Sequence, residues 1–314
     1  MLAYVIRRLL GVIPVMLVVG VFVFSLLHLA PGDPAAIIAG DNATAENIAR
    51  IRSNLGLDRP LHEQFLSWGL ATLRGDLGVS MFSGIPVTTL VQQRVGPTLS
   101  LTLTTLVVAV SIAVTLGVLA AWKAGSLFDR AVMGLAVAGF SVPVFVVGYL
   151  LVYFLALQWR WLPVQGYQEL STGLWNWLRH LILPSLALGL AYVALIARIT
   201  RASMLEVLAE DYIRTASAKG VATMPMLLRH ALKNAAVPIV TVIGIGIALL
   251  ISGVVITESV FNIPGIGRLV VDAIARRDYP IIQGTMILFA GVYVLINLAI
   301  DLSYCFLDPR IRYT

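Results

Sequence analysis

Long apolar runs separated by short polar stretches dominate this chain. There are six such runs, at residues 9–30, 98–122, 131–157, 181–200, 236–257 and 281–304. A helix needs about 20 predominantly apolar residues to cross the hydrocarbon core of a membrane. The pattern therefore predicts an all-α integral membrane protein with six transmembrane helices. We expect Pro143 to kink the third span, whereas Pro184 lies in the first turns of the fourth, where proline is tolerated.

The first apolar run follows Arg7 and Arg8, as the apolar part of a signal peptide would. That part of a signal peptide has only about 7–15 residues and precedes a cleavage site with small residues. This run is longer and ends in Pro31-Gly-Asp-Pro34. We therefore interpret it as a retained first span.

Residues 31–97 form too long a segment to be a bare connection between the first two spans. Three helices are expected there: one capped by Thr44 and ended by Gly56, one opened by Pro60, and one opened by Pro86 that stops at Gly96-Pro97. Their expected inward faces are Ile48, Ile51 and Leu55, then Leu61, Phe65, Trp68 and Leu73, then Val87, Leu90, Val91 and Val95. The segment is predicted to be a small helical extracytoplasmic insertion on the membrane surface.

The chain is accordingly divided into three parts. Residues 1–30 are the N-terminal tail and first span, 31–97 the insertion, and 98–314 a core of five spans. The core includes two polar elements between spans, which are residues 201–235, named here the polar segment, and an outer loop at 258–280.

Composition and charge agree with a membrane protein. The chain is 59% hydrophobic and 12% charged, against about 25% charged residues in soluble domains. The net charge of +6 does not indicate nucleic-acid binding, because the basic residues flank apolar spans and form no patch with interleaved aromatics. With both termini in the cytoplasm, twelve basic residues lie inside and five in the two short outer loops, as the positive-inside rule requires.

The residue types needed for several kinds of chemistry are missing. The deep parts of the predicted spans hold no Asp, Glu, Lys or Arg, which argues against catalytic residues and against proton-coupled transport. Sodium coupling through backbone carbonyls is less strongly excluded. The chain has no phosphate-binding loop, and its four histidines and one cysteine are scattered. We therefore expect no metal and no cofactor on this chain, and active transport would need energy from a partner.

The polar segment is the best candidate for receiving that energy. Helix-forming residues extend from Ser203 to Lys219, Gly220 can end that helix in a left-handed conformation, and Pro225 breaks the chain again. A second short helix is expected over 226–234. A short helix held crosswise between two spans can act as a lever for a partner protein. An ordinary solvated loop with a basic, membrane-facing side fits the residues equally well.

The polar segment also resembles the Glu-Ala-Ala-x-x-x-Gly signature of bacterial ABC importer permeases. Arg214-Thr215-Ala216 stands at the Glu-Ala-Ala position, Gly220 matches the glycine, and Lys233 replaces a usual proline. With those departures, the segment resembles the version of this signature found in the peptide-importer branch of the family. Nearly the whole chain resembles the dipeptide/oligopeptide permease family, through motifs that include Gly75-Asp-Leu-Gly-Val-Ser80, Thr200-Arg-Ala-Ser-Met204, Pro264-Gly-Ile-Gly267, Arg277-Asp-Tyr-Pro280 and Asp308-Pro-Arg-Ile-Arg312.

The resemblance implies a type I ABC importer permease in the bacterial inner membrane. Its expected partners are a second, related permease, two cytoplasmic ATPases that bind ATP and Mg, an extracytoplasmic binding protein, and membrane lipid. Small peptides are the expected substrate, and the alternatives are glutathione, a nickel chelate or another small solute. A stand-alone secondary transporter is the alternative class.

Two groups of site residues follow from this resemblance. The expected ATPase-coupling residues are Asp211, Tyr212, Arg214, Thr215, Ala216, Ala218, Lys219 and Gly220. The expected contacts with the binding protein are Arg268, Arg276, Arg277 and Asp278. The alternative for this second group is that its charges orient the outer loop or meet lipid headgroups.

Overall fold

A computed structural model describes residues 2–29, 33–39, 44–54 and 56–307. Within these ranges the chain is helical, and no strand occurs beyond an isolated bridge between Val79 and Pro86. The described residues fall into two compact units. Unit 1 comprises the chain up to Val95 together with Leu269–Leu295, and unit 2 comprises Gly96–Arg268 with the chain from Ile296 onward.

The predicted spans lie on long apolar helices. Among the described residues, four are long and apolar enough to cross a membrane alone: α1 (Leu2–Leu29), α5 (Val87–Trp122), α8 (Leu174–Leu208) and α14 (Tyr279–Leu307). Two bent pairs raise the number to six if each pair is one span. The first pair is α6 (Leu127–Ser141) with α7 (Val144–Leu151) and a π-helical turn at Val152–Gln158, and the second joins Thr223–Asn234 to α12 (Ala236–Val260).

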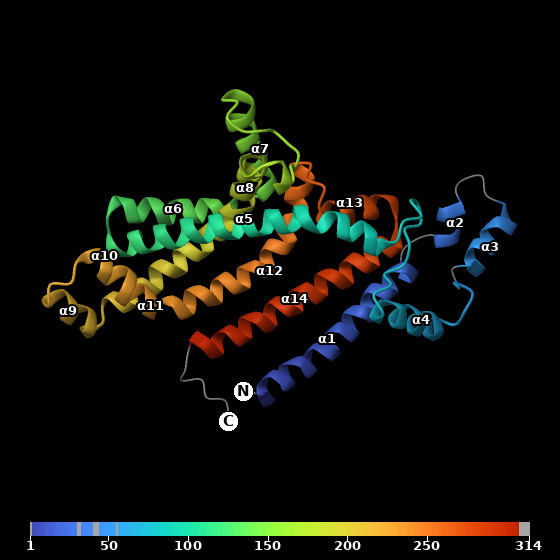
Figure 1. Cartoon of the computed structure of the whole chain (residues 1–314), viewed down its shortest axis with the longest axis horizontal. Helices are drawn as coiled ribbons and strands as arrows, with labels where there is room; N and C mark the ends of the chain where they lie inside the picture. The colour runs from blue at the N-terminus through green and yellow to red at the C-terminus, as the bar shows by residue number, and fades with distance from the viewer. Residues whose placement is uncertain (1, 30–32, 40–43, 55, 308–314) are drawn as a thin grey trace. The chain divides into compact units, whose positions relative to one another are not determined.

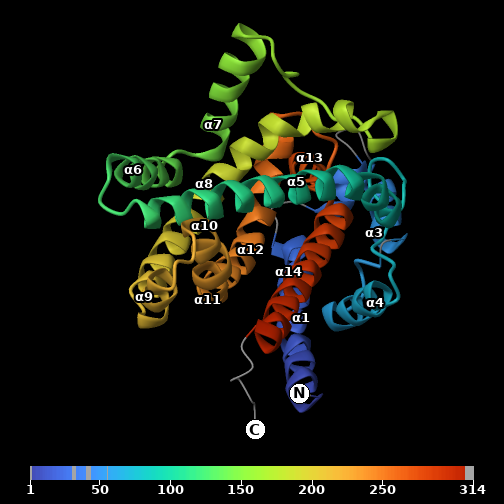
Figure 2. The same cartoon turned by 60° about the vertical axis from the view of Figure 1, so that its left-hand side comes forward.

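The two prolines singled out in the third and fourth spans behave differently. At Pro143 the helix is interrupted and its two halves are bent by 109°, because a residue before proline is pushed into an extended conformation, here Val142 at ψ 126°. This confirms the predicted kink, and α7 turns away from α6 in both views (Figures 1 and 2). The predicted position of Pro184 in the first turns of its helix is wrong. Helix α8 already begins at Leu174, and the proline is buried in the helix interior.

The N-terminal helices of unit 1 follow the sequence signals closely. They are α2 (Pro34–Ala39), α3 (Ala45–Asn54) and α4 (Leu61–Leu73). The side chain of Thr44 accepts a hydrogen bond from the amide of Asn47 (3.3 Å), and Gly56 has φ +66°, so the predicted cap and terminator are confirmed. Leu55, predicted on the inner face of α3, lies outside the described residues.

Helix α4 is only partly oriented as predicted. Phe65 and Trp68 pack against Phe24 of α1, with ring centroids 5.3 and 5.8 Å apart. Leu61 and Leu73 are exposed, so their predicted inward position is wrong. The aromatic contact with α1 involves the middle of α4, and the apolar side chains at its two ends lie beyond it.

The third helix predicted in the insertion does not end where expected. Helix α5 begins at Val87, as the signal at Pro86 predicts, but it continues through Gly96-Pro97 to Trp122. A proline removes one backbone donor, and a membrane helix tolerates this loss where neighbouring groups satisfy the freed carbonyl. The boundary proposed between insertion and core therefore falls within a continuous helix. The division into 1–30, 31–97 and 98–314 stays a prediction.

Unit 2 is built around α8, which contacts α6, α7 and α12. Small residues allow these close approaches, as is usual between membrane helices. A Cβ on Gly189 of α8 would lie 3.4 Å from Ala109 of α5, and Gly246 of α12 lies directly against the ring of Tyr192. The hydroxyl of buried Tyr192 donates to the carbonyl of Ile243. The backbone of α12 is thereby held against α8, on the side of the bundle that leads into the polar segment.

Candidate functional site

The polar segment begins with a break that the sequence did not predict. Instead of one helix from Ser203 to Lys219, α8 ends at Leu208 and α9 spans Asp211–Ala218. Met204 is fully buried and Ile213 is 4% exposed, in the same apolar cluster. On a continuous helix, nine residues at about 100° each would place these side chains on opposite faces. The break turns α9 so that both can be buried together.

The end of α9 is the one the sequence predicts. Gly220 has φ +79°, its amide donates to the carbonyl of Ser217 (3.0 Å), and the amide of Val221 donates to the carbonyl of Ala216 (3.2 Å). This pair of hydrogen bonds is the Schellman motif, which favours glycine at the left-handed position. Gly220 therefore terminates the helix and lets the chain turn back toward the membrane helices.

A second helical stretch follows, close to its predicted position. It comprises a turn at Thr223–Pro225, a π-helical turn at Met226–Ala231 and a last turn at Leu232–Asn234. Pro225 does not break the chain, because it lies in the first turn with helical dihedrals (φ −56°, ψ −40°), where a missing amide costs nothing. The stretch then bends by 66° into α12.

The inner side of the polar segment is anchored in a buried apolar cluster. Its members come from α5, α8, α9, the second helical stretch and α12, and are Val118, Ala121, Met204, Ile213, Leu227, Ala231, Ala235 and Ile239. A hydrogen bond from the side-chain amide of Asn234 to the hydroxyl of Tyr212 (2.8 Å) also joins the second stretch to α9. The polar segment is therefore tied to three membrane helices at once.

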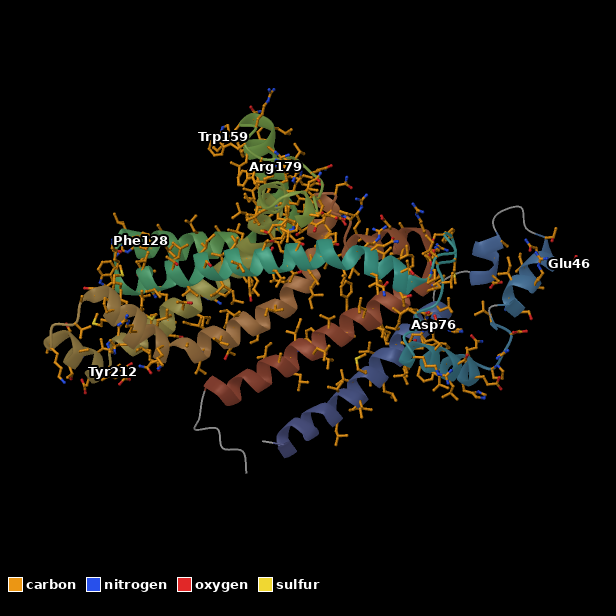
Figure 3. The ribbon with its side chains drawn as sticks, in the orientation of Figure 1. Glu46, Asp76, Phe128, Trp159, Arg179 and Tyr212 are labelled. Carbon is orange, nitrogen blue, oxygen red and sulfur yellow. The ribbon has the colours of Figure 1, made fainter. Side chains whose placement is uncertain are left out.

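The outer side of α9 carries the predicted coupling residues. Asp211, Tyr212, Arg214, Thr215, Ala218, Lys219 and Gly220 are exposed, and Ala216 is half-buried. Figure 3 shows Tyr212 on this helix, at the far end of unit 2. The ion pair between Arg214 and Asp211 (3.4 Å) is exposed on both sides, so it contributes little stability. Among the described residues no group of His, Cys, Asp and Glu could hold a metal ion.

A buried ion pair beside the polar segment was missed by the sequence analysis. Asp129, at the start of α6, accepts a hydrogen bond from Arg201 near the end of α8 (2.7 Å) and another from the amide of Gly125 (2.9 Å). The Asp129 side chain is 4% exposed and that of Arg201 26%. In the sequence, Arg201 counts among the inner basic charges and lies in the Thr200–Met204 motif, and neither observation assigns it a partner. The signal available was one acidic residue among the basic residues between spans two and three, but no sequence pattern identified its partner.

The outer loop of unit 2 is organised by Glu258, at the end of α12. Its carboxylate is fully buried and accepts hydrogen bonds from the hydroxyl of Thr98 (2.6 Å) and the amide of Arg268 (3.0 Å). The hydroxyl of Thr98 also accepts from the amide of Ile266 (2.8 Å). Glu258 therefore satisfies neighbouring groups at the end of α12.

The four predicted docking residues have different surroundings. Arg268 is half-buried and its guanidinium donates to Asn262, whereas Arg276 and Arg277 are exposed. Asp278 is 2% exposed, and its carboxylate accepts from the hydroxyl of Ser80 (2.6 Å). Asp278 thus holds the loop before α5 within unit 1 and does not offer its charge to a partner.

Arg277 occupies a backbone position that favours glycine. Helix α13 (Ile266–Arg276) ends in a second Schellman motif, in which the amide of Arg277 donates to Ile274 (3.2 Å) and that of Asp278 to Ala273 (2.9 Å). Arg277 has φ +58°, and a side chain there costs about 1 kcal/mol relative to glycine. An exposed arginine retained at such a position suggests a use for its charge.

We expect Asp129 and Arg201 to act as a unit. Asp129→Asn alone, or Arg201→Gln alone, should destabilise the protein by about 3 kcal/mol, because each leaves a largely buried charge without its partner. The double variant should lose less than the two single losses combined. Thermal unfolding of the purified permease complex, compared across this double-mutant cycle, measures the coupling. Strictly additive effects would show that the pair contributes no interaction of its own.

Comparison with known proteins agrees with this arrangement. Residues 113–313 match the family model of the binding-protein-dependent transport system inner membrane component, and residues 1–102 match the N-terminal model of the corresponding membrane component. The chain is 58% identical to the probable peptide ABC transporter permease protein y4tP of Sinorhizobium fredii, over 99% of each chain. It is 46% identical to the glutathione transport system permease protein GsiC of Salmonella choleraesuis and 45% identical to that of Escherichia coli, over the full length of each.

Solved structures support the fold. The MetNI methionine ABC transporter in an inward-facing conformation superposes with a TM-score of 0.56, covering 70% of this chain and 96% of that one, at 18% identity. The all-helical architecture is therefore that of type I ABC importer permeases, as predicted. The chain belongs to the family of binding-protein-dependent transport system inner membrane components, and is a multi-pass permease subunit of an ABC importer.

Proposed function

We propose that this chain forms one half of the translocation pathway of an ATP-driven importer for small peptides. The observation that carries the proposal is the two-sided construction of the polar segment. Its inner side is anchored to α5, α8 and α12, and the outer side of α9 is exposed. A partner that displaces α9 would therefore move three membrane helices together, because packed interiors transmit displacements.

The partners of this machine are proposed from the chain's membership of the importer permease family. ATP and Mg would bind on two cytoplasmic ATPase subunits, one of which contacts α9, and a second, related permease would complete the pathway. The excess of basic residues beside the polar segment supports the proposal that this segment and both termini face the cytoplasm, in a bacterial inner membrane. An extracytoplasmic binding protein would deliver the substrate.

The choice of small peptides rests on two relatives. The name of the relative at 58% identity refers to peptides, and that of the relatives at 45–46% identity to glutathione, which is itself a small peptide. Carriage of glutathione, a nickel chelate or another small solute by the same machine is the alternative. A stand-alone secondary transporter would instead move its substrate without ATP or partner subunits.

The binding protein is proposed to meet the exposed arginines at the end of α13. Arg276 and Arg277 present two positive charges there, and the strained backbone of Arg277 supports a role beyond structure. Asp278 is left out of this surface because it is buried. The role of Arg268 in docking stays a prediction.

Crosslinking from α9 tests the proposed function directly. In a Cys305→Ser background, Ala218→Cys carrying a photoreactive maleimide should crosslink to an ATPase subunit, because Ala218 is exposed on the outer side of α9. The yield should change when nucleotide binds. Ser171→Cys is the matched control, because Ser171 is exposed in the loop between α7 and α8, which is predicted to lie outside. If Ala218→Cys forms no such crosslink in an assembled, active complex, α9 is not the coupling element.

Substitution of Arg277 tests the docking surface. Arg277→Gly should relieve roughly 1 kcal/mol of backbone strain, because glycine adopts the left-handed conformation without it. It should nevertheless slow association with the binding protein, and more strongly at low ionic strength. Arg179→Ala removes an exposed arginine from another outer element and should leave association unchanged. Thermal unfolding and binding kinetics measure the two effects, and an unchanged association rate would place docking elsewhere.

A further inference from the structure

A cavity of about 570 Å³ lies within unit 1 and has no part in the function described so far. One wall is apolar and includes Phe24 and Leu27 of α1 and Trp68 of α4. The remaining wall is polar and includes charges of both signs. Its volume lies in the range of small-molecule sites, which are commonly about 300–1,000 Å³.

Hydrogen bonds inside unit 1 hold the polar wall in place. The side-chain amide of Gln64 donates to the carbonyl of Arg59 (2.8 Å), and its oxygen lies 3.2 Å from the ring of His28. On the other side, the carboxylate of Asp76 accepts from the amide of Gly78 (2.9 Å). Figure 3 shows Asp76 beside the C-terminal end of α4. Both loops that border the cavity are therefore fixed by contacts of their own.

The charged groups around the cavity are not paired with one another. Arg59, Glu63 and Asp76 all line it, and none of them forms an ion pair within the described part of the chain. Opposite charges that share a surface commonly neutralise one another. Here one positive and two negative groups remain available, around a cavity whose other wall is apolar.

A largely buried amide also lines the cavity. Gln283 of α14 is 5% exposed, and its amide nitrogen donates to the carbonyl of Val23 (3.3 Å). Among the described residues the side-chain oxygen of Gln283 is not one of the buried atoms left without a hydrogen-bond partner, and no described residue donates to it. This oxygen can therefore accept a hydrogen bond from a donor on a molecule in the cavity.

We propose that this cavity binds a small zwitterionic molecule with a primary ammonium, an anionic group and an apolar portion. Glu63, Asp76 and the oxygen of Gln283 supply acceptors for the ammonium, and Arg59 supplies a donor for the anion. The apolar portion packs on Phe24 and Trp68. A short peptide with free ends has this chemistry, and so does the headgroup of phosphatidylethanolamine. This site goes beyond the proposed function, since a translocation pathway does not require it.

The test uses the assembled permease–ATPase complex without binding protein, in phosphatidylcholine nanodiscs. Isothermal titration with alanyl-phenylalanine should show binding, and both N-acetylation and C-terminal amidation of the probe should weaken it. Glu63→Gln, Arg59→Gln and Gln283→Met should each raise the Kd by about tenfold, as expected for loss of a charge-assisted or buried hydrogen bond. Glu46→Gln and Arg50→Gln are the matched controls. Both lie on α3 and do not line the cavity, and Figure 3 shows Glu46 well away from Asp76.

The two sources of the zwitterion are separated by changing the lipid. If phosphatidylethanolamine in the nanodisc displaces the dipeptide, the lipid headgroup is the natural occupant of the cavity. If the dipeptide binds equally well in the presence of phosphatidylethanolamine, a free peptide is the natural occupant. The proposal is overturned if alanyl-phenylalanine does not bind, or if the three cavity variants bind it like the controls. ATP-dependent peptide uptake by the unmodified importer is measured separately, so failure of the cavity and failure of the proposed function give different results.

Discussion

The burial of Ile213 in the same apolar cluster as Met204 is the packing constraint on which the proposed mechanism depends. It requires the break between α8 and α9, because a continuous helix would point the two side chains in opposite directions. With the break, α9 lies on a cluster shared with α5, the second helical stretch and α12. The polar outer side of α9 is left exposed as a consequence. In the proposed mechanism, a partner protein acts on the membrane helices through this exposed surface.

Three buried carboxylates lie near the ends of apolar helices, and each accepts hydrogen bonds from neighbouring groups. Within unit 2, Asp129 joins the start of α6 to the end of α8, and Glu258 organises the loop that follows α12. Within unit 1, Asp278 holds the loop before α5. Because a buried carboxylate is stable only when its oxygens accept hydrogen bonds, these groups fix the connections between helices. The spans between them are left to apolar packing, in which small residues allow close contact.

Much of the fold could be predicted from the sequence, because the signals concerned are local. Apolar runs located the spans, Gly220 marked the end of α9, and Pro143 marked the sharp bend. The errors arose where a distant contact overrides a local signal. Helix α5 passes Pro97 because membrane helices tolerate the missing donor, and α9 separates from α8 to bury Ile213. The proposed coupling residues on α9 were predicted through resemblance, whereas the ion pair of Asp129 and the inward position of Asp278 depend on partners far along the chain.

The most direct test of the central claim loosens the anchor of α9 without touching its outer side. Ile213→Ala should remove about 2–5 kcal/mol of packing, and Ile13→Ala, at an exposed position on α1, is the matched control. ATP hydrolysis and peptide uptake are measured together in proteoliposomes containing the complete importer and its binding protein. The account predicts that Ile213→Ala keeps hydrolysis but lowers the peptide imported per ATP, while the control changes neither. An unchanged ratio for Ile213→Ala in a correctly assembled complex would contradict it.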